Sequence, residues 1–275
     1  MSVVACLKWA DHRPDVDPLT GAVRTDWRTS GMSDADRAAL EWALRLGEAW
    51  DAPVLAATAG PPAAEAVLVE ALSVGAARAV RVDLPTEAPS DVVAAALAAA
   101  VGVNPRVALC GVWSVDRGSG SVPAFLAAEL GAAQALGLVS LAPSGDVVLA
   151  ERRLDRGARE RLRVPLPAVC SVEGASARLR RASLPGVLAT TRARVDVVAG
   201  PPALMRSAVR SGPAQSGPFR PRAKQLPAPA SPSARERVLE LTGALTDRDP
   251  PQTLVLDPAA AADVLLARLE SWGYR

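Results

Sequence analysis

Short apolar runs that alternate with helical patterns constrain the fold of this chain more than any other feature of its sequence. The runs are Val3 to Leu7, Val54 to Thr58, Ala79 to Val82 and Val107 to Val112. Each is short and rich in small or branched side chains, as expected for a strand buried on both faces. Strands and helices in alternation imply right-handed crossovers. We therefore predict an α/β fold with a mostly parallel sheet, helices on both faces, and ligands bound beyond the carboxyl ends of the strands.

Three helices are expected between these strands. Ser33 is a suitable N-cap for the first helix, which should end near Asp51. The second should begin at Pro62 and stop at Gly75, because proline fits the first helical turn and glycine adopts the left-handed conformation of a C-cap. The third should cover residues 91–101.

The pattern changes after Asp146. Residues 147–154 and 159–164 flank Asp155-Arg156-Gly157, which predicts an antiparallel hairpin and a mixed sheet. Residues 168–173 supply another strand. Pro185 interrupts the apolar run from Leu184 to Leu188 and makes a central strand unsuitable, so this run is interpreted as an exposed loop or docking segment.

Composition divides the chain into three parts. Residues 1–199 form the predicted α/β domain, and residues 200–252 form an extended arm or linker rich in proline, glycine and serine. Residues 253–275 should form a strand, Thr253 to Leu256, and then a helix that Asp257 and Pro258 begin and Gly273 closes. We expect this tail to pack on another subunit.

Several classes of protein are disfavoured by composition. The net charge is only +2 and there is a single histidine, His12, so neither a nucleic-acid surface nor a zinc cluster or catalytic triad is expected. Cys6, Cys110 and Cys170 lie far apart in apolar runs, which indicates buried thiols without a disulfide or a metal. The chain shows no membrane-spanning stretch and no signal peptide, so we expect a cytoplasmic protein.

The stretch from Gly111 to Gly131 is the strongest candidate for a ligand site. It joins a buried strand to a helix through Gly118-Ser119-Gly120-Ser121. Small residues, free amides at a helix start and serine hydroxyls suit a phosphate. A plain serine-glycine turn explains the same residues equally well. Trp113, just after the strand, either stacks on an adenine or packs under the loop.

Two further groups of polar residues have no catalytic interpretation. Asp11, His12 and Asp17 follow the first strand and are best explained as solvated loop residues. Arginines crowd the predicted hairpin, where a solvated face and a surface for an acidic partner or a flavin pyrophosphate explain them equally well. These arginines are Arg152, Arg153, Arg156, Arg159, Arg161 and Arg163.

Segments spread over residues 1–195 and 253–275 resemble the beta subunit of electron transfer flavoproteins. They are VVACLKW, the stretch MSDADRAALEWALRLGE, the stretch AGPPAAEAVLVEALSVGAARAVRV, the glycine-serine loop, VPLPAVCSVE followed by RRASLPGVL, and the terminal DPAAAADVLLARLESWGYR. The chain departs from the family at Ser33-Asp34, where Asn-Pro is usual, and at Asp116-Arg117-Gly118, where an acidic cluster is usual. Among the subgroups of the family, the chain most resembles the divergent actinobacterial, mycofactocin-associated type.

This resemblance implies a Rossmann-like fold of the adenine nucleotide alpha hydrolase type and an electron-carrier subunit that is not an enzyme on its own. An alpha subunit would hold most of the FAD, and this chain would hold a structural AMP and accept electrons from dehydrogenases. Leu184, with Pro185, Gly186, Val187 and Leu188, would dock the dehydrogenase. The implied AMP site comprises Cys6, Ser33, Ala59, Gly111, Trp113, Asp116, Gly118, Ser119, Gly120, Ser121 and Val122.

Two alternatives remain open. In the first, the chain is a bifurcating-type subunit in which a second FAD replaces AMP. In the second, it is a nucleotide-binding homodimer of the universal stress protein type, which shares the strand-to-helix glycine-serine loop.

Overall fold

The computed structural model describes residues 2–102, 105–200, 228–242 and 253–272. They belong to two units, Met1–Phe219 and Arg220–Arg275, and each is described by itself. Most of the predicted arm lies outside the described residues. The division into an α/β domain, an arm and a tail stays a prediction.

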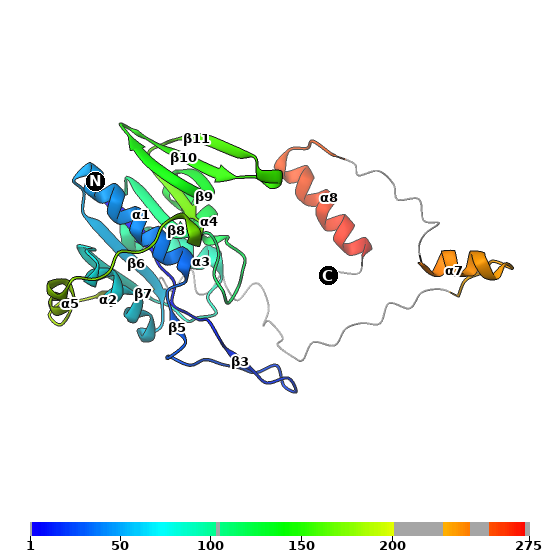
Figure 1. The fold of residues 1–275 in the computed structure, drawn as a ribbon, viewed down its shortest axis with the longest axis horizontal. Helices are drawn as coiled ribbons and strands as arrows, with labels where there is room; N and C mark the ends of the chain where they lie inside the picture. The colour runs from blue at the N-terminus through cyan, green and yellow to red at the C-terminus, as the bar shows by residue number, and fades with distance from the viewer. Residues whose placement is uncertain (1, 103–104, 201–227, 243–252, 273–275) are drawn as a thin grey trace. The chain divides into compact units, whose positions relative to one another are not determined.

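A nine-stranded sheet forms the centre of the first unit (Figure 1). Its order is β11-β10-β9-β12-β8-β1-β6-β7-β13, and every neighbouring pair is parallel except the two that involve β10. The predicted α/β fold and the predicted antiparallel hairpin are confirmed. The strands are β1 (Val3–Cys6), β6 (Val54–Gly60), β7 (Arg78–Asp83), β8 (Val107–Gly111), β9 (Ala133–Ser144), β10 (Val147–Arg153), β11 (Arg159–Pro165), β12 (Ala168–Val172) and β13 (Asp196–Ala199).

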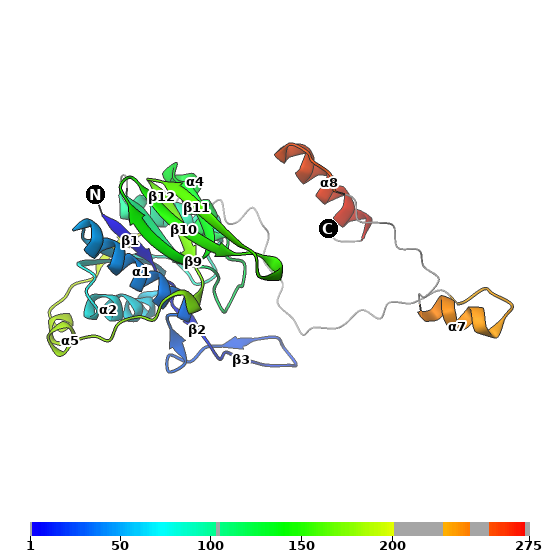
Figure 2. The same ribbon diagram turned by 45° about the horizontal axis from the view of Figure 1, so that its top comes forward.

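Helices cover both faces of this sheet, as Figures 1 and 2 show. One face packs against α1 (Asp34–Trp50) and α2 (Glu65–Ser73), and the other against α3 (Ser90–Val101) and α4 (Val122–Leu130). Leu40 and Leu68 on the first face and Leu126 on the second are fully buried. Full burial of one such side chain contributes about 1.5–3 kcal/mol, so the two apolar layers hold the helices on the sheet.

The helix boundaries follow the predicted caps. The Ser33 hydroxyl accepts a hydrogen bond from the Asp36 amide at 3.0 Å, and α1 ends at Asp51, which adopts a left-handed φ of 47°. The second helix begins with a 3₁₀ turn (Pro62–Ala64) before α2, and Gly75 takes the expected positive φ of 121°. The third starts at Ser90, one residue earlier than predicted.

Two strands of the sheet were not predicted. β9 is the longest strand, yet it contains few branched residues and a glycine, Gly137, with a φ of 71°. Its register against β10 and β12 shifts near this point, which breaks the alternation that normally identifies a strand. β13 pairs with β7 at the edge of the sheet and is exposed along its length. It is therefore unlike the buried apolar runs from which the central strands were predicted.

The run from Leu184 to Leu188 is exposed as predicted, but it is not a loop. It forms the start of α5 (Leu184–Thr190). The Ser183 hydroxyl caps the helix by accepting from the Gly186 amide at 3.1 Å, and Pro185 lies in the first turn, where its missing amide costs nothing. The prediction considered proline only as a strand breaker.

Residues 10–31 leave the sheet after β1 as an excursion of short antiparallel pairs. The pairs are β2 (Ala10–Asp11) with β5 (Ser30–Gly31) and β3 (Asp15–Val16) with β4 (Val23–Arg24). Asp11, predicted to be solvated, is buried: its carboxylate accepts bonds from the amides of Arg13 and Asp26 and from the Thr29 hydroxyl. The hydrogen bond from Thr29 is the main reason why the pKa of Asp11 lies below its ordinary value.

The second unit contains α7 (Ala234–Thr242) and α8 (Pro258–Ser271). Asp257 caps α8 as predicted, since its carboxylate accepts from the amides of Ala259 and Ala260. The strand expected at Thr253 to Leu256 is wrong for this chain, because these residues are irregular, exposed and paired with no strand in the part that the structure describes. The expected closing residue, Gly273, lies outside the described residues.

Candidate functional site

A cavity opens at the carboxyl ends of β1, β6 and β8. Cys6 of β1, Ala59 of β6 and Cys110 of β8 contribute to its lining. The segment before α3 and the loop between β8 and α4 complete the walls. This is the edge of a parallel sheet where α/β proteins bind their ligands.

The loop from Val112 to Ser121 brings its backbone close to the cavity through two left-handed glycines. Gly118 has a φ of 65° and Gly120 a φ of 58°. A Cβ on Gly120 would lie 2.4 Å from the Val112 carbonyl oxygen, whereas one on Gly118 would meet nothing within 4 Å. Only glycine fits at position 120, because the loop folds directly onto the end of β8.

The start of α4 adds polar groups to the same wall. The Ser119 and Ser121 hydroxyls lie 3.1 Å apart, and no side chain caps the helix among the described residues. Val122 begins α4, and Pro123 follows it in the first turn. Uncapped amides at a helix start carry partial positive charge, which attracts an anion.

A lysine that sequence reasoning missed lies at the edge of this wall. Lys8 follows β1, and its Nζ donates to the two carboxylate oxygens of Asp116 at 2.6 and 2.7 Å and to the Ser114 hydroxyl at 3.3 Å. Burial raises the pKa of Asp116, but the hydrogen bonds from Lys8 and Ser114 outweigh it and the pKa is lowered. The ion pair therefore ties the loop to the end of β1.

Asp36 is a buried carboxyl in the cavity wall. Burial raises its pKa to about 6, although bonds from the Ser33 hydroxyl and from backbone groups, together with the charge of Lys8, oppose the rise. The Ser33 hydroxyl lies 2.9 Å from the Asp36 Oδ2. A Cβ on Gly111 would lie 2.8 Å from the other carboxyl oxygen, so glycine at the end of β8 leaves room for this side chain.

The three cysteines are buried as predicted, and each is a free thiol. Cys6 and Cys110 are register partners in the β1 and β8 pair, and both line the cavity. The hydrogen bond between the Cys110 thiol and Cys6, with burial, raises the pKa of Cys110 well above its ordinary value, and burial raises that of Cys170 to about 12. Thiols with such pKa values stay protonated and are poor nucleophiles.

Most of the residues implied by the family resemblance meet at this cavity. Trp113 is among them and is half exposed, so it does not pack under the loop. Three do not line the wall: the Ser33 hydroxyl forms a hydrogen bond to Asp36, Asp116 forms an ion pair with Lys8, and Gly118 lies in a turn. The lining residues from the prediction are Cys6, Ala59, Gly111, Trp113, Ser119, Gly120, Ser121 and Val122.

Lys8, Asp36 and Arg117 also line the cavity but were not predicted. Arg117 donates to the Ala88 carbonyl at 2.9 Å and to the Thr86 carbonyl at 3.2 Å, which joins the loop to the segment before α3. The role of Asp36 in the cavity cannot be recognised from the sequence, because an acidic residue is also common in the first turn of an ordinary helix. Arg117 gives no signal, since its partners are backbone atoms distant in sequence.

The predicted docking segment lies away from this cavity, beside α2 (Figure 1). On α5, Leu184 is 72% exposed and Leu188 is 59% exposed. Gly186 faces α2, where an added Cβ would lie 2.4 Å from the Ser73 carbonyl oxygen. The helix is therefore seated on α2 by its backbone, and its leucines point outward.

The arginines of the hairpin are partly neutralised. Arg152 pairs with Glu160, Arg153 with Glu173 at 3.1 Å, and Arg159 with Glu151 at 3.5 Å. Arg161 and Arg163 are exposed on β11. Both interpretations of this face, a solvated surface and a partner surface, therefore remain open.

Comparison with known proteins identifies the family to which this chain belongs. Protein FixA of Azorhizobium caulinodans is 29% identical over 210 residues, which cover 72% of this chain and 74% of the relative. The electron transfer flavoprotein subunit beta of Mycobacterium tuberculosis is 32% identical over 176 residues, which cover 61% and 66%. The electron transfer flavoprotein domain profile matches residues 23–203, more than half of the chain. The chain belongs to the electron transfer flavoprotein beta-subunit family.

Membership of this family makes the chain an electron-transfer subunit. A further member from Clostridium acetobutylicum, also an electron transfer flavoprotein subunit beta, is 28% identical over 162 residues, covering 57% of this chain and 62% of the relative. Among the described residues, no helix is long and apolar enough to cross a bilayer. In the same residues, no cluster of histidine, cysteine and carboxylate side chains is suited to a metal ion.

Proposed function

We propose that this chain is the beta subunit of a heterodimeric, cytoplasmic electron transfer flavoprotein. In this role it holds AMP in the cavity at the ends of β1, β6 and β8, and an alpha subunit holds most of the FAD. The observation that carries the proposal is the cavity itself: the close approach of Gly120 to the Val112 carbonyl folds the loop onto the end of β8, and Ser119, Gly120 and Ser121 then line the cavity.

The residues of this wall suit a nucleotide monophosphate. The amides at the start of α4 and the hydroxyls of Ser119 and Ser121 would bind the phosphate, and Lys8 and Arg117 add positive charge nearby. Trp113, half exposed at the cavity, offers an aromatic face to the base. A nucleotide bound here would supply no redox chemistry and would stabilise the fold by mass action.

FAD would supply the redox chemistry of the complex. The chain contributes instead a surface for the electron donor. Leu184 on α5 would anchor a flavin-linked or other dehydrogenase by placing its exposed apolar side chain in a pocket of the partner.

Nucleotide content tests the proposal. The chain is co-expressed with candidate alpha subunits from the same genome, and FAD and AMP released from the purified complex are measured by chromatography. One FAD and one AMP per heterodimer support the proposal. Two FAD without AMP indicate a bifurcating-type subunit, and a homodimer that holds only ATP or AMP indicates the universal stress protein alternative.

Leu184→Ala tests the docking role separately. The substitution should raise the KM of the dehydrogenase for the flavoprotein by about tenfold or more, since anchor side chains typically contribute at least ~1–2 kcal/mol. Flavin and AMP contents should stay at the wild-type level, because α5 lies away from the cavity. Unchanged transfer kinetics would remove Leu184 from the docking surface.

A further inference from the structure

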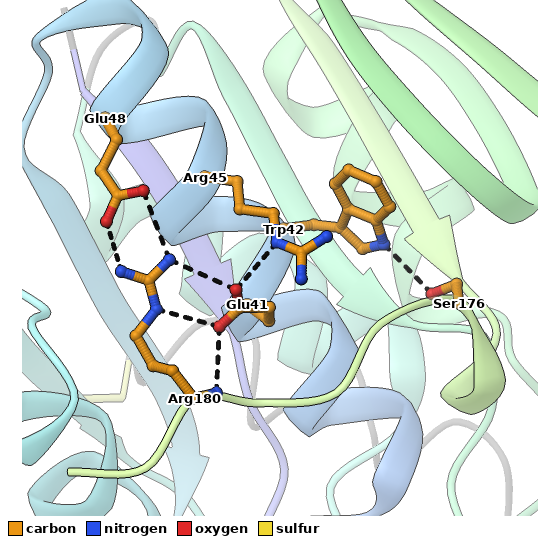
Figure 3. Close-up of polar contacts among 6 residues, drawn as sticks. All are labelled: Glu41, Trp42, Arg45, Glu48, Ser176 and Arg180. Carbon is orange, nitrogen blue, oxygen red and sulfur yellow. Dashed lines mark hydrogen bonds and ion pairs between the residues drawn. The ribbon is translucent and has the colours of Figure 1, made fainter.

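The segment from Gly174 to Ser183 connects β12 to α5 and is called here the strap. It begins with a 3₁₀ turn (Gly174–Ser176) and then runs as irregular chain across the outer face of α1 (Figure 3). A Cβ on Gly174 would lie 3.1 Å from backbone atoms of Asp34 and Ala35, so the strap touches the start of α1. The Trp42 indole donates to the Ser176 hydroxyl at 3.2 Å.

Arg180 fastens the far end of the strap. Its backbone amide and its Nε both donate to Glu41 Oε2, at 3.1 and 3.0 Å. The other guanidinium nitrogens reach Glu48, about two turns further along α1, and one of them also reaches Glu41 Oε1 at 3.3 Å. Figure 3 shows the guanidinium between the two carboxylates, with Arg45 on the opposite side of Glu41.

Charge and burial favour a specific geometry for this cluster. Glu41 is only 6% exposed, and two guanidinium groups surround it, those of Arg45 and Arg180. Burial raises the pKa of Glu41, but bonds from Arg180 and Arg45 outweigh it and leave the pKa lowered; the bond from Arg180 likewise lowers that of Glu48. A planar guanidinium shared by two carboxylates has few alternative arrangements, so the cluster fixes the strap as well as binding it.

The strap matters because α5 makes few contacts of its own. Its leucines point outward, and Gly186 is the residue that packs closely against α2. After α5, the chain is fixed again by β13, which pairs with β7 and carries the Arg78 to Asp196 ion pair at 2.9 Å. Before α5, residues 177–182 are held by two half-buried apolar residues, Ala177 and Leu179, and by the polar contacts of Arg180.

We propose that Arg180 is a positioning residue for dehydrogenase docking: by joining the strap to Glu41 and Glu48 of α1, it holds α5 ready for its partner. This inference rests on the proposed docking role of α5. Arg180 itself does not contact the dehydrogenase. A helix that is ordered before binding loses less conformational freedom on association, which improves affinity without a new contact.

The test uses the heterodimer with its alpha subunit and four variants of this chain. Arg180→Ala removes both carboxylate contacts, and Arg180→Lys keeps the charge but cannot bridge Glu41 and Glu48 with one ammonium group. Arg178→Ala is the matched control, because Arg178 is an exposed arginine of the same strap without a polar contact among the described residues. Leu184→Ala reports whether α5 docks at all.

Two quantities are measured for each variant. The first is hydrogen–deuterium exchange of the amides in residues 186–190, which should accelerate about tenfold in Arg180→Ala and stay unchanged in Arg178→Ala. The second is electron transfer from a purified flavin-linked dehydrogenase that reduces the wild-type heterodimer with saturation. Arg180→Ala should raise KM by about fivefold at constant kcat and flavin content, and Arg180→Lys should recover part of the loss.

The outcomes separate this inference from the proposed function. Unchanged exchange in Arg180→Ala overturns the inference whatever the kinetics. Faster exchange with an unchanged KM, while Leu184→Ala raises KM, leaves α5 as the docking element and overturns the positioning role of Arg180. An unchanged KM in Leu184→Ala refutes the docking role, and the inference falls with it.

Discussion

Alanine at position 120 should remove the nucleotide from the cavity, whereas alanine at position 118 should not. Both glycines have similar positive φ values, 58° and 65°. They differ in what a Cβ would meet: the Val112 carbonyl oxygen at 2.4 Å for Gly120, and open space for Gly118. The pair of variants therefore separates the cost of the backbone conformation from the cost of the close approach.

The magnitude follows from these two terms. An alanine held at left-handed φ costs about 1–2 kcal/mol, and this term applies to both variants. Gly120→Ala adds a contact far below van der Waals distance. The Val112 carbonyl cannot move away freely, because its residue is held by a 3.0 Å hydrogen bond from the Val112 amide to the Val172 carbonyl. The loop must shift instead, and a displacement of its backbone donors should weaken nucleotide binding by about 100-fold, or ~3 kcal/mol.

The assay is the AMP content of the purified heterodimer after extensive dialysis, with thermal unfolding as a second measurement. Gly118→Ala should retain AMP and lose a few degrees in Tm, and Gly120→Ala should lose AMP and be stabilised when AMP is added back in excess. Equal retention by both variants would refute the argument that the close approach of Gly120 to the Val112 carbonyl holds the loop's backbone donors in place. Equal loss would show that left-handed conformation alone controls the site.

Three further substitutions test the packing and capping of α1. Asp36→Asn should stabilise the heterodimer at pH 8 by about 2–3 kcal/mol and by less at pH 5, because the pKa of this carboxyl is about 6 in the folded state against 3.8 in the unfolded chain. Its contribution to stability is complete below pH 3.8 and is lost as pH rises through 6, so a Tm difference independent of pH would contradict the reasoning. Ser33→Ala should cost about 1 kcal/mol in chemical denaturation through loss of the α1 cap, and no change would mean that the cap bond is worth nothing. Gly47→Ala should lower Tm despite the better helix propensity of alanine, because its Cβ would lie 2.7 Å from Val54 Cγ2 and 2.9 Å from the Ala52 carbonyl; a higher Tm would show that this contact relaxes freely.

The candidate site illustrates how far sequence reasoning extends. The glycine-serine loop was a candidate because glycine and serine between a strand and a helix suit a phosphate as well as a plain turn, and its place at the sheet edge followed from parallel topology. Asp36 and Lys8 were missed because a carboxyl in a first helical turn and a lysine after a strand are ordinary. Their role depends on Gly111 and Asp116, which are distant in sequence and adjacent only in the fold.

Local periodicity and capping chemistry in the sequence determined the parallel core, the limits of α1 and the hairpin, because each depends on residues within a few positions of one another. Tertiary structure decided what lacked a local signal. β9 is a strand because β10 and β12 pair with it on both sides, in spite of Gly137. Likewise, the cluster of Glu41, Glu48 and Arg180 joins residues more than 130 positions apart, and no local pattern encodes a contact that exists only when the strap crosses α1.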